Sequence, residues 1–234
     1  MAEVEKISSG FFFKGQLLHL LLLAVLLATV GLLVSFRPLQ DGQFLGVSTP
    51  TWFVVALVVP IIHQIYVWLI WRGELCFGAV GTSFGDRGFV IYQAVFIVLL
   101  LARPATVALL AISDHETFQI PIVARIATSV LLLLPAIYTL YSVARYFGIS
   151  RACGIDHFDP SYRNLPMVRE GIFRFTGNAM YTFAFLLLWA IAVAGASWAA
   201  FVVAAFSHAY IWVHYFCTER PDMRLIYGHE ERPE

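Results

Sequence analysis

Charged residues are scarce in this chain, and cysteines are rarer still. Of its 234 residues, 13% are charged and 60% are hydrophobic, and the mean hydropathy is +0.78. Soluble domains contain about 25% charged residues, so this composition excludes an ordinary soluble protein and indicates several membrane spans. The net charge is zero, but in a membrane protein the positions of the charges are more informative than their sum. We expect no nucleic-acid partner.

The cysteines and histidines do not suggest a metal site. The three cysteines, Cys76, Cys153 and Cys217, have a wide, unpaired spacing that matches neither a disulfide framework nor a metal motif. His208 and His214 are six residues apart, which separates them by about 240° around a helix, so they cannot bind one metal ion from the same helix. We therefore expect no metal or haem.

Six stretches qualify as membrane spans, each of which takes about 20 mostly apolar residues. They are residues 15–36, 51–71, 89–112, 121–144, 179–195 and 198–217. Six spans return both termini to one side of the membrane. Most basic residues fall on that side, including those of the long loop 145–178, so the positive-inside rule places the loop and both termini in the cytoplasm. The membrane would be of the inner-membrane or endoplasmic-reticulum type.

The last two predicted spans should form a tight helical hairpin. Their connection is about Gly195-Ala196-Ser197, and both spans are rich in alanine, whose small side chain lets helices approach closely in lipid. The two inner ends of the hairpin are 178–181 and 217–220. Tyr181 and Glu219 are therefore predicted to lie close together, at the polar end of the hairpin.

Arg103 is an ionisable residue inside the third predicted span. Such residues are costly in lipid and suggest function by default. Pro104 follows directly, and a proline frees a backbone carbonyl that the guanidinium could satisfy. We therefore favour a helix kink with a local partner for Arg103.

The loop 145–178 differs in kind from the other connections. It holds glycines at 148, 154 and 171, which allow sharp turns or a close approach of the backbone to a ligand. It also holds five arginines. Attraction to anionic lipid, about 1 kcal/mol per charge, is a simpler explanation for the arginines. The loop alone does not decide between ligand binding and this attraction to the membrane surface.

The end of this loop carries the most specific pattern in the chain. Residues 167–181 read MVREGIFRFTGNAMY, and they resemble the integral-membrane methyltransferases, which include phosphatidylethanolamine N-methyltransferases and isoprenylcysteine carboxyl methyltransferases. The pattern of that family is approximately L-V-x-x-G-x-Y-R-x-x-R-[HN]-P-x-Y, then a helical hairpin, then E-E. The chain aligns with it without a gap, and NAMY at 178–181 is most similar to the N-P-M-Y form of the phospholipid enzymes.

Two further segments extend the resemblance, which covers about residues 138–228. Glu219-Arg220-Pro221, with Tyr227, resembles the E-E-P segment, and GIDHF at 154–158 resembles the upstream glycine-aromatic segment. Three positions depart from the pattern: Gly177 replaces an arginine, Ala179 replaces a proline, and Arg220 replaces the second glutamate.

The resemblance implies S-adenosylmethionine in a cytoplasm-facing pocket and a lipid acceptor that enters from the bilayer. The predicted fold is thus an all-α polytopic membrane protein of about six transmembrane helices, with a tight C-terminal hairpin and a cytoplasmic cofactor pocket. It forms one membrane domain, 1–234, in which residues 1–120 supply N-terminal spans and residues 121–234 a methyltransferase-like core.

The resemblance also implies roles for individual residues. The residues expected to bind the cofactor are Gly154, Phe158, Gly171, Asn178, Met180, Tyr181, Glu219 and Arg220. Arg163, Arg169 and Arg174 would hold a lipid phosphate or a carboxylate, for which guanidinium groups are suited. His157 or Asp156 would remove the proton that an amine acceptor must lose before it attacks.

The acceptor and the activity leave alternatives open. The N-x-M-Y form favours a phospholipid amine headgroup, whereas a prenylated-cysteine carboxylate or a small thiol remains an alternative. The three departures motivate a different class, a membrane protein that kept the fold and binds lipid or a partner without catalysis. A sterol or steroid reductase that uses NADPH shares the C-terminal topology, but its extended signature is missing after Tyr227. The oligomeric state is open.

Overall fold

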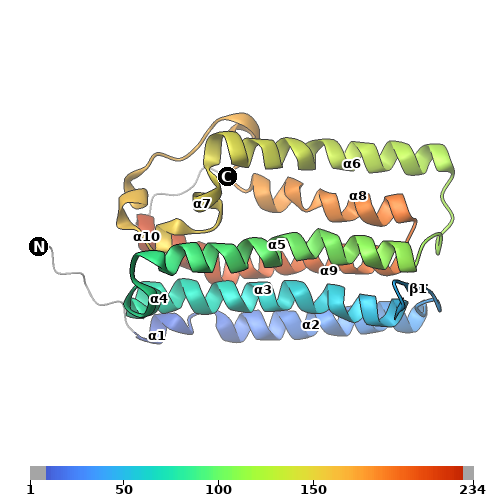
Figure 1. The fold of residues 1–234 in the computed structure, drawn as a ribbon, viewed down its shortest axis with the longest axis horizontal. Coiled ribbons are helices and arrows are strands. Elements are labelled where there is room, and N and C mark those ends of the chain that lie inside the picture. The colour runs from blue at the N-terminus through green and yellow to red at the C-terminus, as the bar shows by residue number, and fades with distance from the viewer. Residues whose placement is uncertain (1–8, 229–234) are drawn as a thin grey trace, which may run out of the picture.

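The computed structural model describes residues 9–228 as a bundle of helices that run along one common direction (Figure 1). The end segments 1–8 and 229–234, to which the prediction of cytoplasmic termini refers, lie outside the described residues. The long helices are α2 (Gln16–Phe36), α3 (Thr49–Phe77), α5 (Gly88–Ser113), α6 (Ile122–Ser142), α8 (Leu186–Gly195) and α9 (Trp198–His214).

Shorter elements cover the two ends of the bundle. The short helices are α1 (Ser9–Phe12), α4 (Ala79–Phe84), α7 (Ile149–Ala152) and α10 (Arg220–Tyr227). At the opposite end, β1 (Gln43–Phe44) and β2 (Val47–Ser48) pair antiparallel in a small hairpin. Single 3-10 turns lie at Gly85–Arg87, Ile155–His157, Pro160–Asn164 and Gly171–Arg174.

The membrane-protein class is confirmed, and the number of long spans differs from the prediction. Within residues 9–228, five helical stretches are long and apolar enough to cross a membrane: Ser9–Phe36, Thr49–Phe77, Ala79–Ser113, Ile122–Phe147 and Trp198–Tyr227. The predicted span 179–195 corresponds to the shorter apolar helix Met180–Gly195.

Helix α9 lies at the centre of the bundle and contacts α2, α3, α5 and α8. Its core positions are small, and Ala199, Ala200, Val203 and Ala204 are completely buried. Small side chains let the neighbouring helices approach closely, which is the main source of helix association in lipid. Figure 1 shows α6 at the outer edge of the bundle, where it packs against α8.

One buried carboxylate fixes the turn between α8 and α9. Asp114 Oδ2 accepts hydrogen bonds from the Ser197 hydroxyl at 2.7 Å and from the Ala199 backbone N–H at 2.9 Å. Ala196, between the two helices, has a left-handed backbone with φ of 46°. A carboxylate at the first turn satisfies N–H groups that have no partner inside the helix, so this cap holds the tight connection.

The expected carbonyl partner of Arg103 is not found. Within the described chain, Nε and Nη2 of Arg103 have no hydrogen-bond partner, and the guanidinium instead lies over the Phe185 ring at 5.8 Å. The Thr106 hydroxyl donates to the carbonyls of Ala102 and Arg103. The Thr106 hydroxyl therefore bonds the backbone carbonyls near Pro104, and the Arg103 side chain is buried inside the bundle.

Candidate functional site

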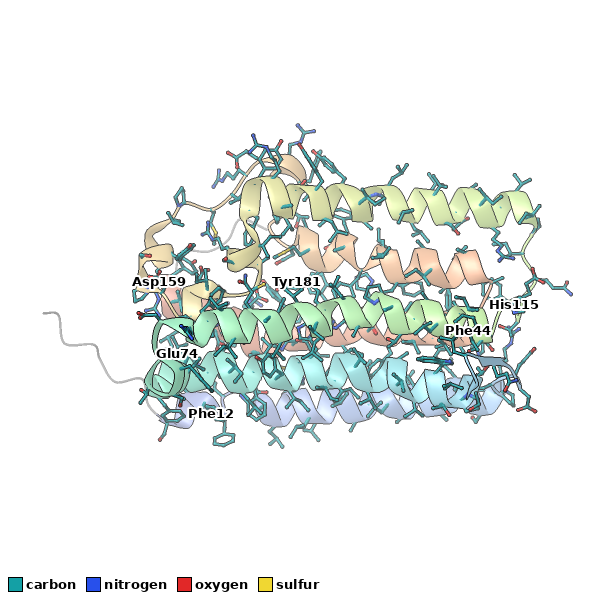
Figure 2. All side chains as sticks on the ribbon, viewed as in Figure 1. Phe12, Phe44, Glu74, His115, Asp159 and Tyr181 are labelled. Carbon is teal, nitrogen blue, oxygen red and sulfur yellow. The ribbon has the colours of Figure 1, made fainter. Side chains whose placement is uncertain are left out.

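A cavity of about 750 Å³, here called the main cavity, opens at the end of the bundle where α1, α4, α7 and α10 lie (Figure 1). Figure 2 shows Phe12, Glu74 and Asp159 at this end, and Phe44 and His115 at the opposite end. The walls come from the end of α3, from residues 147–156, from the loop 163–177, from the start of the α8 region and from α10. Segments far apart in sequence therefore meet around one space.

Tyr181 and Glu219 face each other in the wall of the main cavity. The Tyr181 hydroxyl donates a hydrogen bond to Glu219 Oε2, although 38 positions separate the two residues. Both line the cavity, and Met180 lies beside them. Glu219 is 7% exposed, so its carboxylate is held by partners from the protein and still reaches the space.

Three π-helical segments surround this end of the bundle within residues 9–228: Val143–Phe147, Met180–Ala184 and Tyr215–Glu219. Each of them contributes a residue to the cavity wall, and these include Phe147, Tyr181 and Glu219. A π-turn inserts an extra residue and so changes which side chains face inward, and such turns are frequent at functional sites. The local helix geometry thus turns Tyr181 and Glu219 toward the same space.

Asp156 is a buried carboxylate in the cavity wall. Its Oδ2 accepts a hydrogen bond from the Tyr227 hydroxyl, and its Oδ1 has no hydrogen-bond partner in the part of the chain described. Arg163 Nε donates to the backbone carbonyl of Asp156 at 3.0 Å. Asp156, Arg163 and Tyr227 all line the main cavity. The carboxylate is therefore anchored through Oδ2, and its buried Oδ1 has no partner among the described residues.

His157, the other residue predicted to act on a proton, does not line the main cavity. Its ring stacks on Trp71 with centroids 4.1 Å apart, and Nε2 lies 3.5 Å from Asp222 Oδ2. Its Nδ1 lies 3.2 Å from the carbonyl oxygen of Gly154. The side chain is behind the cavity wall because residues 155–157 form a 3-10 turn that directs Asp156 and His157 to different sides.

The two glycines predicted near the cofactor have different surroundings. Gly154 lines the main cavity with φ of 83°, and an added Cβ would lie 2.3 Å from Trp71 Cζ2. Gly171 packs instead against α6, because its Cβ would lie 2.6 Å from Ser142 Oγ and 2.9 Å from the Tyr146 ring. Gly171 thus permits a close approach of two protein segments and lies outside the cavity lining, and its contact with a cofactor stays a prediction.

The contact of Phe158 with a cofactor also stays a prediction. Its ring packs on Phe89 and Tyr92 with centroid distances of 5.1 Å in both cases, and it does not line the main cavity.

The nearby Cys153 is buried, and burial raises the pKa of its thiol. A raised pKa makes this thiol a weaker nucleophile.

The three arginines predicted to hold an acidic group all border the main cavity. They are Arg163, Arg169 and Arg174. Arg169 and Arg174 are exposed at the rim, and the Arg174 guanidinium lies over the Phe175 ring at 4.6 Å. The cavity thus combines buried carboxylates, aromatic rings and a cationic rim, which suits a ligand with hydroxyl or amino groups at one end and an anionic group near the opening.

The part of the chain that forms most of this wall also matches a family model. Residues 124–230 match the phospholipid methyltransferase family. The resemblance predicted from the sequence is confirmed over this region, and methyl transfer to a lipid is the activity that the family indicates. No curated protein and no solved structure matches the chain.

Within the matched region, three positions depart from the pattern of the family. Arg220 is exposed, lies over Phe216 at 5.9 Å and is absent from the cavity lining, and its contact with a cofactor stays a prediction. Ala179 is completely buried in a core cluster. Gly177 borders the cavity, and a Cβ there would meet nothing within 4 Å. The Arg220 charge therefore lies away from the cavity. The small residues Ala179 and Gly177 are accommodated in the core cluster and at the cavity border.

Asn178 lies beside the cavity wall without being part of its lining. Its backbone carbonyl accepts hydrogen bonds from the N–H groups of Tyr181 and Thr182, and its Oδ1 is buried with no partner among residues 9–228. Asn178 thus starts the helix that presents Met180 and Tyr181. Its place in a cofactor contact stays a prediction.

Residues before the phospholipid methyltransferase match also build the site. Trp71 lines the main cavity, and Arg72, next to it, is completely buried. Arg72 Nε donates to Asp222 Oδ1 at 2.9 Å, and its other nitrogens donate to five backbone carbonyls, those of Phe11, Phe12, Lys14, Cys217 and Thr218. In the sequence alone, Arg72 is only a charged residue at the end of an apolar stretch, and Trp71 is an aromatic residue of the kind common at membrane interfaces.

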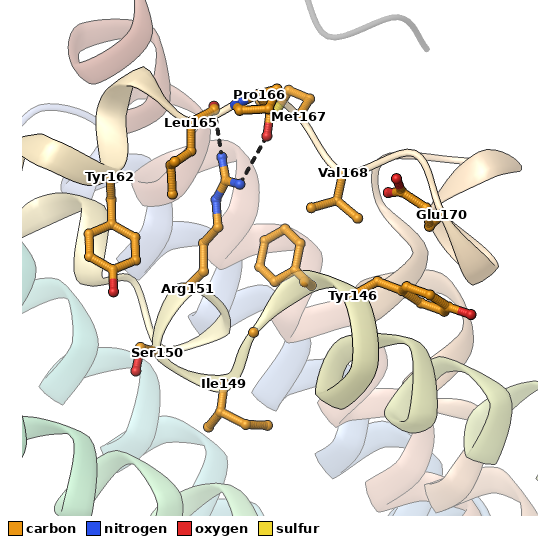
Figure 3. Close-up of a pocket in the computed structure, with 12 residues that line it drawn as sticks. Tyr146, Ile149, Ser150, Arg151, Tyr162, Leu165, Pro166, Met167, Val168 and Glu170 are labelled. Carbon is orange, nitrogen blue, oxygen red and sulfur yellow. Dashed lines mark hydrogen bonds between the residues drawn. The ribbon is translucent and has the colours of Figure 1, made fainter.

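A second cavity of about 520 Å³ adjoins the main cavity on the other side of residues 165–168 (Figure 3). Figure 3 shows the Arg151 side chain reaching this segment, where it donates hydrogen bonds to the backbone carbonyls of Leu165 and Pro166 at 3.4 and 3.0 Å. Arg151 borders both cavities. Its guanidinium therefore holds the wall that separates them.

Proposed function

We propose that the protein transfers a methyl group from S-adenosylmethionine to the amine headgroup of a phospholipid at the cytoplasmic surface of a membrane. The observation that carries the proposal is the pair Tyr181–Glu219 in the wall of a 750 Å³ cavity. This pair lies within a region that matches phospholipid methyltransferases. The cytoplasmic placement rests on the basic residues at the cavity end and the positive-inside rule.

The cavity residues fit this cofactor. Pockets for small molecules measure roughly 300–1,000 Å³ and combine apolar walls with a few polar groups, and the main cavity has this size and lining. Glu219 would accept hydrogen bonds from the ribose diol or the amino group. Tyr181, Met180 and Trp71 would provide the aromatic and apolar walls, and aromatic faces favour a sulfonium cation by about 0.5–2 kcal/mol. When bound, S-adenosylmethionine supplies an electrophilic methyl group on a positive sulfur.

The acceptor would lie between the cationic rim and Asp156. Arg163, Arg169 and Arg174 would hold the lipid phosphate, which places the headgroup amine toward the cavity interior. Holding two reactants in line is worth several kcal/mol, and the reaction needs no covalent intermediate with the protein. The aromatic and apolar walls of the main cavity would exclude water from the reacting groups.

Asp156 would take the proton of the acceptor ammonium. Its Oδ1, which is buried and has no hydrogen-bond partner among the described residues, would accept that proton, while Tyr227 holds Oδ2 in place. The neutral amine then uses its lone pair to form the new N–C bond as the S–C bond breaks, and the proton remains on the carboxylate until it exchanges with water. We prefer Asp156 to His157 for this step because only Asp156 lines the cavity.

The test uses the full chain purified in lipid nanodiscs. Calorimetry with S-adenosylmethionine should give saturable binding, and NADPH under the same conditions should give none. Labelled S-adenosylmethionine should then transfer label to ethanolamine phospholipids in preference to a prenylated-cysteine peptide or a small thiol. Absence of S-adenosylmethionine binding would refute the cofactor, whereas binding with label on another acceptor would refute only the headgroup.

A further inference from the structure

Four hydrogen-bonded side chains, here called the polar network, link the start of α2 to α9 and to the π-helical segment Tyr215–Glu219 that follows α9. Gln16 Nε2 donates to Thr218 Oγ1 at 3.1 Å, and Gln16 Oε1 lies 3.0 Å from His19 Nδ1. His19 Nε2 lies 2.9 Å from the Tyr210 hydroxyl oxygen. All four residues are buried, with exposed fractions between 0 and 4%, and none of them lines the main cavity.

The polar network holds the Gln16 amide in one orientation. Gln16 Oε1 can only accept a hydrogen bond, so His19 Nδ1 must carry the proton between them. The amide N–H group is then directed at Thr218. Connected polar networks in a protein interior favour one arrangement of the surrounding helices, because each hydrogen bond is directional.

Two further contacts reach the backbone of the same π-helical segment. Gly15, directly before α2, has φ of 80°, and an added Cβ would lie 2.6 Å from the carbonyl oxygen of Cys217. Arg72 of α3 donates to the carbonyls of Cys217 and Thr218 at 3.2 and 3.4 Å. The N-terminal part of the chain therefore holds residues 217 and 218, and Glu219, which lines the main cavity, follows directly.

The direction of the Glu219 side chain depends on the helical phase of this segment. A π-helical turn contains one residue more than an α-helical turn, so relaxation to an α-helix would turn Glu219 by roughly 100°. The carboxylate would then leave the Tyr181 hydroxyl, to which it is hydrogen-bonded. Because π-helical turns are rare, the segment needs contacts from outside that favour its geometry.

We propose that Gln16 is a positioning residue for cofactor binding. Through Thr218 it fixes the rotation of the segment Tyr215–Glu219, and this rotation directs the Glu219 carboxylate into the main cavity. Gln16 lies in α2, whereas the family match begins only at residue 124. The inference rests on the proposed function, since the ligand of Glu219 in question is S-adenosylmethionine.

The first experiment measures S-adenosylmethionine binding by calorimetry, with the full chain in nanodiscs. Gln16→Met keeps an unbranched side chain but removes both hydrogen bonds, and it should weaken binding roughly threefold to tenfold, the usual effect of a lost hydrogen bond. Thr29→Val is the control, because the exposed Thr29 hydroxyl bonds within α2, to the Val25 carbonyl. Equal affinities of Gln16→Met and the wild type would overturn the proposal.

A double-mutant cycle shows whether Gln16 acts through Glu219. In the Glu219→Ala background, Gln16→Met should cause no further loss of affinity, because the carboxylate that it positions is gone. A general loss of stability would lower the affinity by the same factor in both backgrounds, and this additive result would overturn the proposal.

Thr218 gives a second pair of variants, which decides the question if Gln16→Met does not fold. Thr218→Val has nearly the same shape without the hydroxyl, whereas Thr218→Ser keeps the hydroxyl. Thr218→Val should weaken binding roughly threefold or more, and Thr218→Ser should retain most of the wild-type affinity. Equal affinities of these two variants would overturn the proposal.

Hydrogen exchange of the ligand-free protein separates this proposal from the proposed function. The amides of residues 215–219 should exchange faster in Gln16→Met than in the wild type, roughly tenfold, and Thr29→Val should match the wild type. Unchanged exchange would overturn the role of Gln16 even if the wild type binds S-adenosylmethionine. If the wild type binds none, the proposed function fails, and faster exchange would still support the hold of Gln16 on this segment.

Discussion

The Tyr181 hydroxyl donates a hydrogen bond to the carboxylate of Glu219, and this contact joins the two inner ends of the α8–α9 hairpin. Both residues come from π-helical segments, Met180–Ala184 and Tyr215–Glu219. The carboxylate is nearly buried and still borders the main cavity. A ligand that offers hydroxyl or amino groups would therefore meet an oriented acceptor.

Glu219→Ala should weaken S-adenosylmethionine binding at least tenfold, which corresponds to about 1.4 kcal/mol. The variant removes an acceptor in the cavity wall and also the partner of the Tyr181 hydroxyl. Calorimetry in nanodiscs gives the dissociation constant. Arg220→Ala is the matched control, because this neighbouring side chain is exposed outside the cavity and its loss should leave the affinity unchanged. Equal affinities for both variants would show that the cofactor binds elsewhere.

Arg174→Ala should impair the acceptor and spare the cofactor. The Arg174 guanidinium is exposed at the cavity rim, where a phosphate would form a charge-assisted hydrogen bond worth about 1.5–3 kcal/mol. We expect KM for the phospholipid to rise at least tenfold, with unchanged binding of S-adenosylmethionine. Steady-state kinetics at varied lipid content, combined with calorimetry, separates the two effects. A loss confined to cofactor binding would reverse the assignment.

Asp156→Asn should lower kcat by about 100-fold, since a positioned base contributes roughly 10²–10⁴ to the rate. Asparagine can still accept the hydrogen bond from Tyr227, so cofactor binding should persist. Raising the pH should restore part of the activity, because more of the amine is then already neutral. In His157→Gln the loss should be smaller and should show no such recovery. Full activity of Asp156→Asn at neutral pH would exclude the carboxylate as the base.

Gly154→Ala should destabilise the protein by about 1–3 kcal/mol, the usual cost of overpacking. The added methyl would lie 2.3 Å from Trp71, and φ of 83° disfavours any side chain. Thermal unfolding in nanodiscs measures the effect. Gly177→Ala is the comparison, because its Cβ would meet nothing within 4 Å, and it should change stability by less than about 0.5 kcal/mol. Similar values for both variants would contradict the described packing around Trp71.

The arrangement of the hairpin could be predicted because it follows from few constraints. A short connection and alanine-rich spans leave little freedom for the path of two helices, so the proximity of Tyr181 and Glu219 follows from sequence alone. The rim arginines were equally accessible to prediction, because charged side chains at the membrane surface must face a polar space.

The orientation of individual loop residues could not be predicted in this way. His157 and Asp156 are neighbours, yet a 3-10 turn sends only Asp156 to the cavity. Glu219 and Arg220 are also neighbours, at the end of a π-helical segment, and only Glu219 lines the cavity. A motif specifies residue types, whereas the direction of each side chain depends on the local helical phase, which a single inserted residue changes.

Arg72 gives the N-terminal spans a part in building the main cavity, although the family match begins only at residue 124. Its guanidinium joins the backbone near Phe12 to that near Thr218, and its ion pair holds Asp222. A fragment limited to residues 124–230 would leave that aspartate without its cation and would lack Trp71 at the ligand space. The main cavity can therefore be completed only after α10 has been synthesised, because Arg72 then joins the segment near Phe12 to the segment near Thr218.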